Sequence, residues 1–240
     1  MTGLFSIPRS QGLRMLDVML EVSTIFSQAL LCLCWFWQLQ FSRTIKPFSS
    51  RREVVLISIP WRTGAYRLNS DDSWTPLLDW VNSTNWHDWG VDAIATDPVD
   101  PERLYLAVGA YTMSWDPNNG QILRSTDQGA TWASTNLPFK VGGNMPGRGI
   151  GERLAVDPNS NNILYFGARS GHGLWKSVDY GVTWNNVTAF HWVGTYFANA
   201  SNVYTADIDG LAWVTFDSTS GTAGSPTPRI FVGEFAAFGY

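Results

Sequence analysis

Two short stretches of this chain share one pattern: STDQGATW at residues 125–132 and SVDYGVTW at residues 177–184. Both read Ser-x-Asp-x-Gly-x-Thr-Trp, which predicts a tight turn between two strands. The aspartate accepts hydrogen bonds from amides of its own turn, the glycine supplies a positive φ, and the hydroxyls tie the ends together. The tryptophan is a large apolar body that packs between neighbouring structural units. The residues with this structural role are Ser125, Asp127, Gly129 and Trp132 in the first stretch and Ser177, Asp179, Gly181 and Trp184 in the second.

The two turns belong to a longer internal repeat. ATDPVDPERLYLAVGA (95–110) aligns with AVDPNSNNILYFGARS (155–170), and a third copy starts at GLAWVTF (210–216) and reaches RIFVGEF (229–235). Each copy alternates short β-type runs with turn residues, which predicts four antiparallel strands per copy. Such units bury their faces only against neighbouring units, as the blades of a β-propeller do. We therefore predict an all-β fold, a partial propeller of about three to four blades.

Composition agrees with this fold class and excludes others. Apolar residues make up 45% of the 240 residues, which is enough for a sizeable core. The chain contains 13 Trp and 22 Gly, and only 15% of its residues are charged. This profile favours short strands and tight turns over long solvated helices or disorder. The net charge of −4, with no basic cluster among the aromatic residues, argues against nucleic acid as a partner.

The first part of the chain differs in kind from the rest. Residues 22–41 contain no charged residue and are about long enough for a helix to cross a hydrocarbon layer of ~30 Å. Polar residues dilute this stretch and basic residues lie on both sides of it. A membrane anchor, a signal-like segment and a buried helix therefore all stay open. We divide the chain into residues 1–58, an unmatched apolar and basic segment that is a candidate helix, and residues 59–240, the partial propeller.

The cysteines and histidines do not predict a metal site, and no cofactor is expected. Cys32 and Cys34 lie one residue apart, which suits neither a usual disulfide framework nor a four-ligand zinc site. His87, His172 and His191 show no ligand spacing, so we expect isolated surface or loop histidines.

The turn pattern resembles the Asp-box, a structural motif of sialidases, sortilin-type receptors and several glycoside hydrolases. The intervening strings resemble one family in particular, glycoside hydrolase family 74, which comprises xyloglucanases and related reducing-end-specific cellobiohydrolases. The resemblance covers residues from about Gly64 to Asp217 and is carried by GAYRLNSDDSWTPLLDWV (64–81), DPVDPERLYLAVGAYT (97–112), LPFKVGGNMPGRGIGERLAVDPN (137–159), ILYFGARSGHGLWKSVDYGVTW (163–184) and GLAWVTFD (210–217). The resemblance implies two β-propellers with a glucan cleft between them and hydrolysis of β-1,4-glucan backbones with inversion. This chain corresponds to part of the N-terminal propeller.

Inversion needs one carboxylic acid to protonate the departing oxygen and one carboxylate to activate water. By resemblance the first is an Asp in a TD-x-GGAYRW motif, and the matching stretch IPWRTGAYRL (59–68) has Trp61 at that position. An indole cannot transfer a carboxyl proton. By resemblance the second Asp belongs to the other propeller, which we expect to lie outside this chain. We therefore assign no catalytic residue and predict that this chain is inactive alone.

Other carboxyl groups do not replace the missing pair. Asp71 and Asp72 read as a solvated turn. Asp207 and Asp209 would point the same way along an extended segment, without an opposing partner.

Sugar binding needs aromatic faces for the apolar side of glucose rings and planar hydrogen-bonding groups for the hydroxyls. Packing between blades is the commoner role of any one aromatic residue, but their concentration in loops favours a saccharide groove. The expected substrate-binding residues are Tyr66, Arg67, Trp86, Trp89, Tyr111, Trp115, Asn144, Arg148 and Trp192.

The resemblance thus predicts a truncated part of a xyloglucan-active endo-β-1,4-glucanase, with β-glucan or xyloglucan as its partner. Two alternatives stay open: a non-catalytic glucan-binding chain and a protein-binding Asp-box propeller. An open array of blades exposes strand edges, which predicts a partner chain or self-association. Secretion is expected from the family resemblance and from sequons at Asn82, Asn186 and Asn199.

Overall fold

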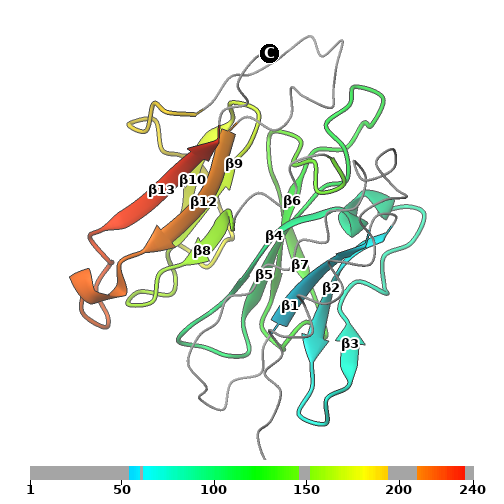
Figure 1. Ribbon diagram of the computed structural model, residues 1–240, viewed down its shortest axis with the longest axis horizontal. Coiled ribbons are helices and arrows are strands. Elements are labelled where there is room, and N and C mark those ends of the chain that lie inside the picture. The colour runs from blue at the N-terminus through cyan, green and yellow to red at the C-terminus, as the bar shows by residue number, and fades with distance from the viewer. Residues whose placement is uncertain (1–53, 60–61, 146–151, 194–209, 236–240) are drawn as a thin grey trace, which may run out of the picture. The chain divides into compact units, whose positions relative to one another are not determined.

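The structure, a computed structural model, describes residues 54–59, 62–145, 152–193 and 210–235 (Figure 1). For residues 54–59, 62 and 63 it describes the backbone alone. The described residues belong to one compact unit, Gln40–Tyr240. Their regular structure consists of thirteen β-strands and two short 3-10 helices. The prediction of an all-β fold is therefore confirmed for this part of the chain.

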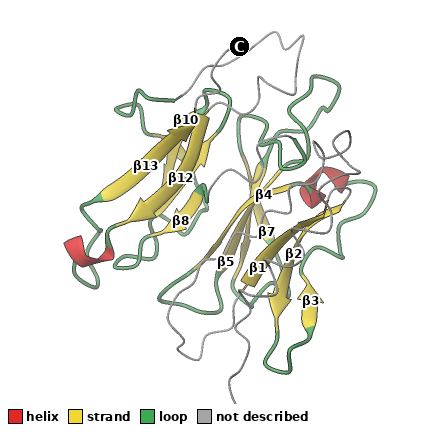
Figure 2. Cartoon of the chain, viewed as in Figure 1, coloured by secondary structure: helices red, strands yellow, loops and turns green. Residues whose placement is uncertain are grey.

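The strands form four antiparallel sheets, shown in yellow in Figure 2. The first sheet contains β1 (Val54–Ile59), β2 (Arg62–Leu68) and β3 (Trp74–Pro76). The second contains β4 (Val91–Thr96), β5 (Leu104–Val108), β6 (Gln121–Ser125) and β7 (Ala133–Asn136). The third contains β8 (Leu154–Val156), β9 (Leu164–Ala168), β10 (Gly173–Ser177) and β11 (Asn185–Asn186). The fourth pairs β12 (Gly210–Phe216) with β13 (Ile230–Phe235).

Strand order follows chain order in every sheet. The second and third sheets each contain the four strands expected from the sequence repeat. The third copy of the repeat contributes two strands, β12 and β13, within the described residues. The 3-10 helices η1 (Trp86–Trp89) and η2 (Ser218–Ser220) lie in connections between strands.

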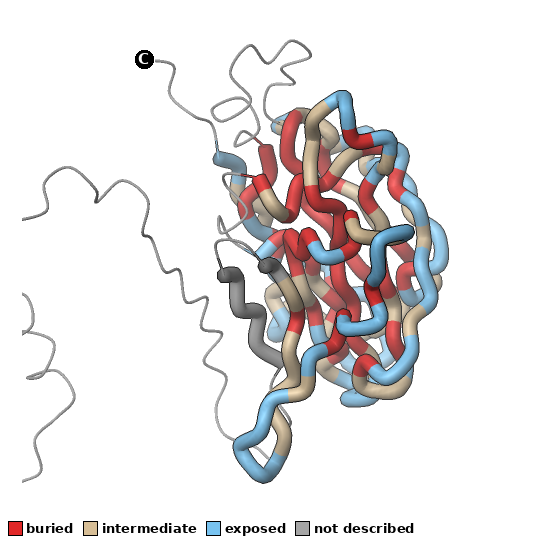
Figure 3. Tube along the Cα trace, turned by 90° about the vertical axis from the view of Figure 1, so that its right-hand side faces the viewer, coloured by how far each residue is buried: buried red, intermediate tan, exposed pale blue. Residues whose placement is uncertain are grey.

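The apolar core consists of three clusters, each shared by two successive sheets. Strand β5 shows how one strand serves two clusters, because all five of its residues are buried. Leu104, Leu106 and Val108 belong to the cluster shared with the first sheet. Tyr105 and Ala107 belong to the cluster shared with the third sheet. Alternate side chains of a strand point to opposite faces, so a continuous apolar run marks a sheet that is covered on both faces. Figure 3 shows buried residues running through the interior of the unit.

Because successive strands are antiparallel, the connections fall at two opposite ends of the sheets. The hairpin turns β4–β5, β6–β7, β8–β9 and β10–β11 lie at one end, which we call the turn end. The β5–β6 and β9–β10 loops and the segments that enter β4 and β8 lie at the other, which we call the loop end.

The predictions made for residues 1–53, including the candidate membrane segment at residues 22–41, fall outside the described residues. Within the described ranges, no helix has the length and apolar character that a membrane span requires.

Candidate functional site

Three aromatic side chains gather at the loop end of the second sheet. Trp86 comes from η1, before β4, while Tyr111 and Trp115 come from the β5–β6 loop. Trp86 stacks on Trp115 with ring centroids 6.3 Å apart and an interplanar angle of 13°. Tyr111 lies 5.9 Å from Trp86 and 5.0 Å from Trp115. Asn144 Nδ2 donates to the Tyr111 hydroxyl at 2.9 Å. We call Trp86, Tyr111, Trp115 and Asn144 the aromatic cluster.

Hydrogen bonds of the glycine backbone hold three connections together: the segment before β4, the β5–β6 loop and the segment after β7 that contains Asn144. Gly109 N donates to the Gly90 carbonyl at 2.8 Å, and Gly143 N donates to the Gly109 carbonyl at 2.6 Å. Asn144 N donates to the Ala110 carbonyl at 2.8 Å. A Cβ at Gly90 would lie 2.3 Å from Ala110 Cα, and a Cβ at Gly143 would lie 2.2 Å from Gly90 O. The loops therefore approach as closely as they do because these positions have no side chain.

The long β5–β6 loop is held by a buried anchor. Lys140 Nζ donates to the backbone carbonyls of Asp116 and, at 2.9 Å, of Asn118. The Asp116 carboxylate accepts from both the backbone and the side-chain amide of Asn118, each at 3.0 Å. These bonds fix the loop next to Trp115, whose indole N–H meets the Met113 sulfur at 2.9 Å. The cluster therefore stands on an ordered loop.

The aromatic cluster contains one exposed residue and three half-buried residues. Trp115 is 59% exposed, while Trp86, Tyr111 and Asn144 are half-buried. A platform of indole and phenol rings beside an amide presents an apolar surface with hydrogen-bonding groups at its margin. This combination suits the apolar face and the hydroxyl rim of a sugar ring.

A buried polar pair, His87 and Asp88, follows Trp86 in η1. His87 is 6% exposed and Asp88 is 3% exposed, and His87 Nε2 lies 3.2 Å from Asp88 Oδ1 and 3.2 Å from Gln121 Nε2. Burial raises the pKa of the Asp88 carboxyl, and the charge of His87 opposes that rise. The expectation of a surface or loop histidine is wrong for His87, because η1 turns its ring inward against β6. Sequence reasoning missed Asp88 and Gln121, and only the aromatic residues on either side of the pair in NWHDWG mark the place.

The described carboxyl groups near the cluster are buried rather than open to a sugar bound there. Asp88, Asp92 and Asp116 are all at most 3% exposed. Asp92 is committed to Arg153 at 2.8 Å and to Arg169 at 2.6 Å. A glucan on the platform would not reach these groups. Within the described residues, no cluster of His, Cys, Asp and Glu suited to a metal ion occurs.

The remaining residues expected to bind substrate are not among the four residues of the aromatic cluster, although Trp89 shares η1 with Trp86. Trp89 ends η1 and is 46% exposed. Trp192 is 67% exposed and lies in the connection after β11, where it contacts Phe190 with ring centroids 6.0 Å apart. The structure does not bring Arg67 to the loop end, because its guanidinium donates to the Gln128 carbonyl at 2.8 Å in the β6–β7 turn.

Tyr66 precedes Arg67 on β2 and pairs with Pro76 of β3. Trp61 and Arg148, the other two positions singled out from the sequence, fall outside the described residues.

The two repeated turns at the turn end have the same internal geometry. In the first, Ser125 Oγ accepts from Gly129 N at 2.8 Å and donates to Asp127 Oδ1 at 2.8 Å. Asp127 also accepts from the amide and hydroxyl of Thr131, at 2.8 and 2.6 Å. These bonds lower the pKa of Asp127 to about 2, the Thr131 hydroxyl first among them. Every one of these bonds recurs in the second turn, among Ser177, Asp179, Gly181 and Thr183, with the same distances.

The tryptophans that follow these turns pack inward. Trp132 packs on the cluster shared with the first sheet and donates to the Leu77 carbonyl at 3.2 Å. Trp184 packs on the cluster shared by the second and third sheets. Gly129 and Gly181 have positive φ angles of 86° and 78°. Gln128 and Tyr180 before them also have positive φ, 58° and 59°, a feature that sequence reasoning missed because neither residue type favours it.

Curated relatives of this chain are named as xyloglucanases. A xyloglucanase of Hypocrea jecorina (strain QM6a) is 63% identical over 173 residues, which are 71% of this chain and 21% of that protein. A xyloglucanase of Paenibacillus sp is 64% identical over 171 residues, 71% of this chain and 17% of that protein. The chain therefore spans about a fifth of the length of the curated relatives it matches. No protein-family model matches the sequence.

Two solved structures of GH74 enzymes are similar to this chain in fold. The crystal structure of the GH74 xyloglucanase from Xanthomonas campestris matches with a TM-score of 0.67 and 39% identity, over 77% of this chain and 26% of that chain. The crystal structure of the GH74 enzyme from Niastella koreensis matches with a TM-score of 0.61 and 35% identity, over 75% of this chain and 24% of that chain.

Proposed function

Because this chain is homologous to the xyloglucanases of glycoside hydrolase family 74 over 71% of its length, we propose that it binds a β-1,4-glucan of the xyloglucan type. The observation that carries the proposal is the aromatic cluster. Two connections deliver Trp86, Tyr111 and Trp115 to one place, and a third segment adds Asn144, whose amide is bonded to the Tyr111 hydroxyl. Rings of this kind stack on the apolar faces of glucose units, and the amide bonds to their hydroxyls.

We propose that the four sheets are blades of a partial β-propeller and that the two repeated turns are Asp-boxes. The strand order within each sheet and the apolar clusters between successive sheets support this architecture. Residues 59–240 form the propeller part in this proposal, and β1, which starts at Val54, adds a strand from the segment before it. Glucan then meets the loop end, while the turn end supports the blades.

Hydrolysis by this chain alone is not part of the proposal. Trp61 occupies the place at which the family motif has its catalytic Asp, and the described carboxyl groups next to the cluster are buried. A glucanase activity would need a carboxyl pair that the described residues do not supply. Binding without cleavage is therefore the function that this chain supports by itself.

Calorimetric titration with xyloglucan oligosaccharides tests the binding proposal. We expect Trp115→Ala to weaken binding about tenfold, as loss of an exposed aromatic anchor does at other interfaces. Trp74→Ala is the matched control, because Trp74 is similarly exposed, at 44%, but starts β3 at the opposite end. No heat with the unaltered chain, or equal loss in both variants, would rule out the cluster as the glucan site.

A reducing-sugar assay tests the second half of the proposal separately. Release of reducing ends from xyloglucan by the purified chain would contradict the prediction that the chain alone is inactive. It would not affect the proposal that the chain binds glucan.

The family homology and the exposed sequons at Asn82 and Asn186 support a secreted chain. We propose in addition that strand edges promote self-association, because β13 pairs only with β12 among the described strands and carries the exposed side chains Phe231 and Phe235. Retention of the expressed chain inside the cells would contradict secretion, and a monomer at all concentrations in sedimentation would contradict self-association.

A further inference from the structure

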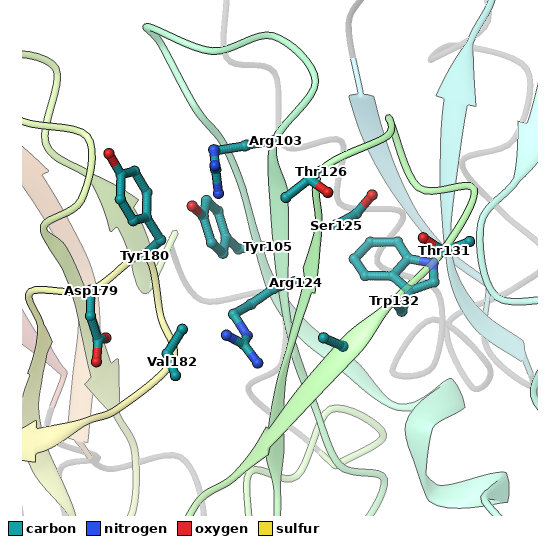
Figure 4. Close-up of a pocket in the computed structure, with 11 residues that line it drawn as sticks. Arg103, Tyr105, Arg124, Ser125, Thr126, Thr131, Trp132, Asp179, Tyr180 and Val182 are labelled. Atoms are coloured by element: carbon teal, nitrogen blue, oxygen red, sulfur yellow. The ribbon is translucent and has the colours of Figure 1, made fainter.

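A pocket of about 350 Å³ lies at the turn end, between the second and third sheets. Figure 4 shows its walls: Arg103, Tyr105 and Arg124 project from the second sheet, and Asp179, Tyr180 and Val182 face them from the second repeated turn. The aromatic cluster is at the opposite end of the same sheet. The pocket is therefore independent of the proposed glucan site.

Arg124 is the first feature that points to a ligand. Its Nε is buried and has no hydrogen-bond partner within the described residues, and no described carboxylate forms an ion pair with its guanidinium. The side chain passes over Gly181, where an added Cβ would lie 3.3 Å from Arg124 Cδ. A guanidinium always carries its charge, and leaving such a group partly buried and unpaired is costly.

Tyr105 is the second feature. Tyr105 is 1% exposed, and its buried hydroxyl lies beside the Arg103 guanidinium, which can only donate to it, so the hydroxyl proton has no acceptor in the described part of the chain. Burial raises the pKa of this phenol to about 12, so the group stays protonated and keeps a proton to donate. An unsatisfied buried hydroxyl in a pocket wall calls for an acceptor from outside the protein.

The other charges in the pocket favour an anion. The Arg103 guanidinium lies 4.4 Å from the centroid of the Tyr180 ring, and its Nε donates to Asp100 at 3.0 Å. Asp179 is the carboxylate in the wall, and its oxygens accept bonds from Ser177 and Thr183 of its own turn. Two guanidinium groups therefore face the pocket against one carboxylate that is already satisfied.

The repeat offers an internal comparison. Arg124 is paired with Tyr105 across β5 and β6, and Lys176 is paired with Tyr165 in the same register across β9 and β10. In the second copy the Lys176 ammonium lies over the Tyr165 ring at 5.4 Å, and Phe216 packs against that ring at 5.8 Å. In the second copy Phe216 thus packs beside the tyrosine of this pair, whereas in the first copy the pocket lies beside it.

We propose that this pocket binds a small oxyanion-bearing ligand, a carboxylate or a phosphate, with Arg124 as the charged contact and the Tyr105 hydroxyl as a second donor. Guanidinium groups bind both kinds of oxyanion through paired N–H donors. A volume of about 350 Å³ lies at the small end of the range for ligand pockets, which suits a single sugar acid or an inorganic oxyanion.

Calorimetric titration of the whole chain tests this with three probes: sodium glucuronate, inorganic phosphate and glucose. We expect binding of at least one anion and none of glucose. Arg124→Gln should weaken anion binding about tenfold or more, and Tyr105→Phe should weaken it with little change in thermal stability, because the lost hydroxyl donates to no group in the described structure. Lys176→Gln, the same charge change at the equivalent strand position, should leave anion binding unchanged.

The two anions separate the sources of the ligand. Binding of glucuronate beyond that of phosphate supports a sugar acid, and binding of phosphate alone supports an inorganic oxyanion. No binding of either anion, or affinities equal in Arg124→Gln and the unaltered chain, would overturn the proposal. Circular dichroism of each variant separates loss of the ligand site from loss of the fold.

Discussion

At the scale of single residues, Ser125 closes its turn with one small buried side chain. The residue is 2% exposed, and its hydroxyl donates to Asp127 Oδ1 while accepting from Asp127 N and Gly129 N. Ser177 holds the equivalent position in the second turn, with 1% exposure and the same three bonds. One hydroxyl therefore closes each turn and orients its aspartate.

We predict that Ser125→Ala lowers the free energy of unfolding by about 1–3 kcal/mol, because buried amides lose their acceptor. Ser177→Ala should cost a similar amount, since the geometry is repeated. Ser73→Ala serves as control, because Ser73 also bonds to an aspartate two residues away but is exposed. Urea denaturation followed by tryptophan fluorescence measures all three. A destabilisation by Ser73→Ala as large as that by Ser125→Ala would show that the buried hydroxyl has no special role.

Among the connecting elements, the loops at the loop end depend on their glycines for their close approach to one another. The four residues of the aromatic cluster come from three connections, and backbone hydrogen bonds among Gly90, Gly109 and Gly143 set how close those connections come. The platform for sugar is therefore a consequence of loop backbone packing.

Gly90→Ala should both destabilise the chain, by about 1–3 kcal/mol as overpacking does, and weaken oligosaccharide binding. The added methyl group would meet the Ala110 backbone, which cannot move aside as a side chain can. Gly64→Ala is the stability control, because its nearest neighbours are atoms of the Tyr66 side chain, the nearest at 3.3 Å. Thermal melting and calorimetric titration check the two effects. An unaltered glucan affinity in Gly90→Ala would show that the loops do not need this close approach.

On the scale of the whole molecule, one buried ionic group ties three sheets together. Asp92 lies on β4, Arg153 precedes β8, and Arg169 follows β9, all at most 2% exposed. Arg153 Nε also donates to the Leu211 carbonyl of β12 at 2.7 Å. Because its members come from the second, third and fourth sheets, this group acts between units that local turns cannot join.

We predict that Asp92→Ala destabilises the chain by about 3–5 kcal/mol, since it leaves two buried arginines without their shared carboxylate. Arg229→Ala, which removes an exposed ion pair with Asp217, should change stability by less than about 1 kcal/mol. Chemical denaturation measures both. If Asp92→Ala were as mild as Arg229→Ala, the ionic group would not hold the sheets together.

The sequence by itself determined the turns and the strands. The hydrogen bonds of Ser125 and Asp127 reach partners at most four residues away, so the pattern Ser-x-Asp-x-Gly-x-Thr-Trp contains all the groups that the turn needs. The repeat likewise predicted the strands of the second and third sheets, because short apolar runs between turns are a local signal.

Only the tertiary structure decided which side chains share a site. Tyr111 and Asn144 are 33 residues apart in the chain, Arg124 and Tyr180 meet across two sheets at one pocket, and Arg67 proved to bond the β6–β7 turn. These contacts depend on how whole sheets and loops pack against one another. Residue types and spacings along the chain record the local hydrogen bonds but not that packing.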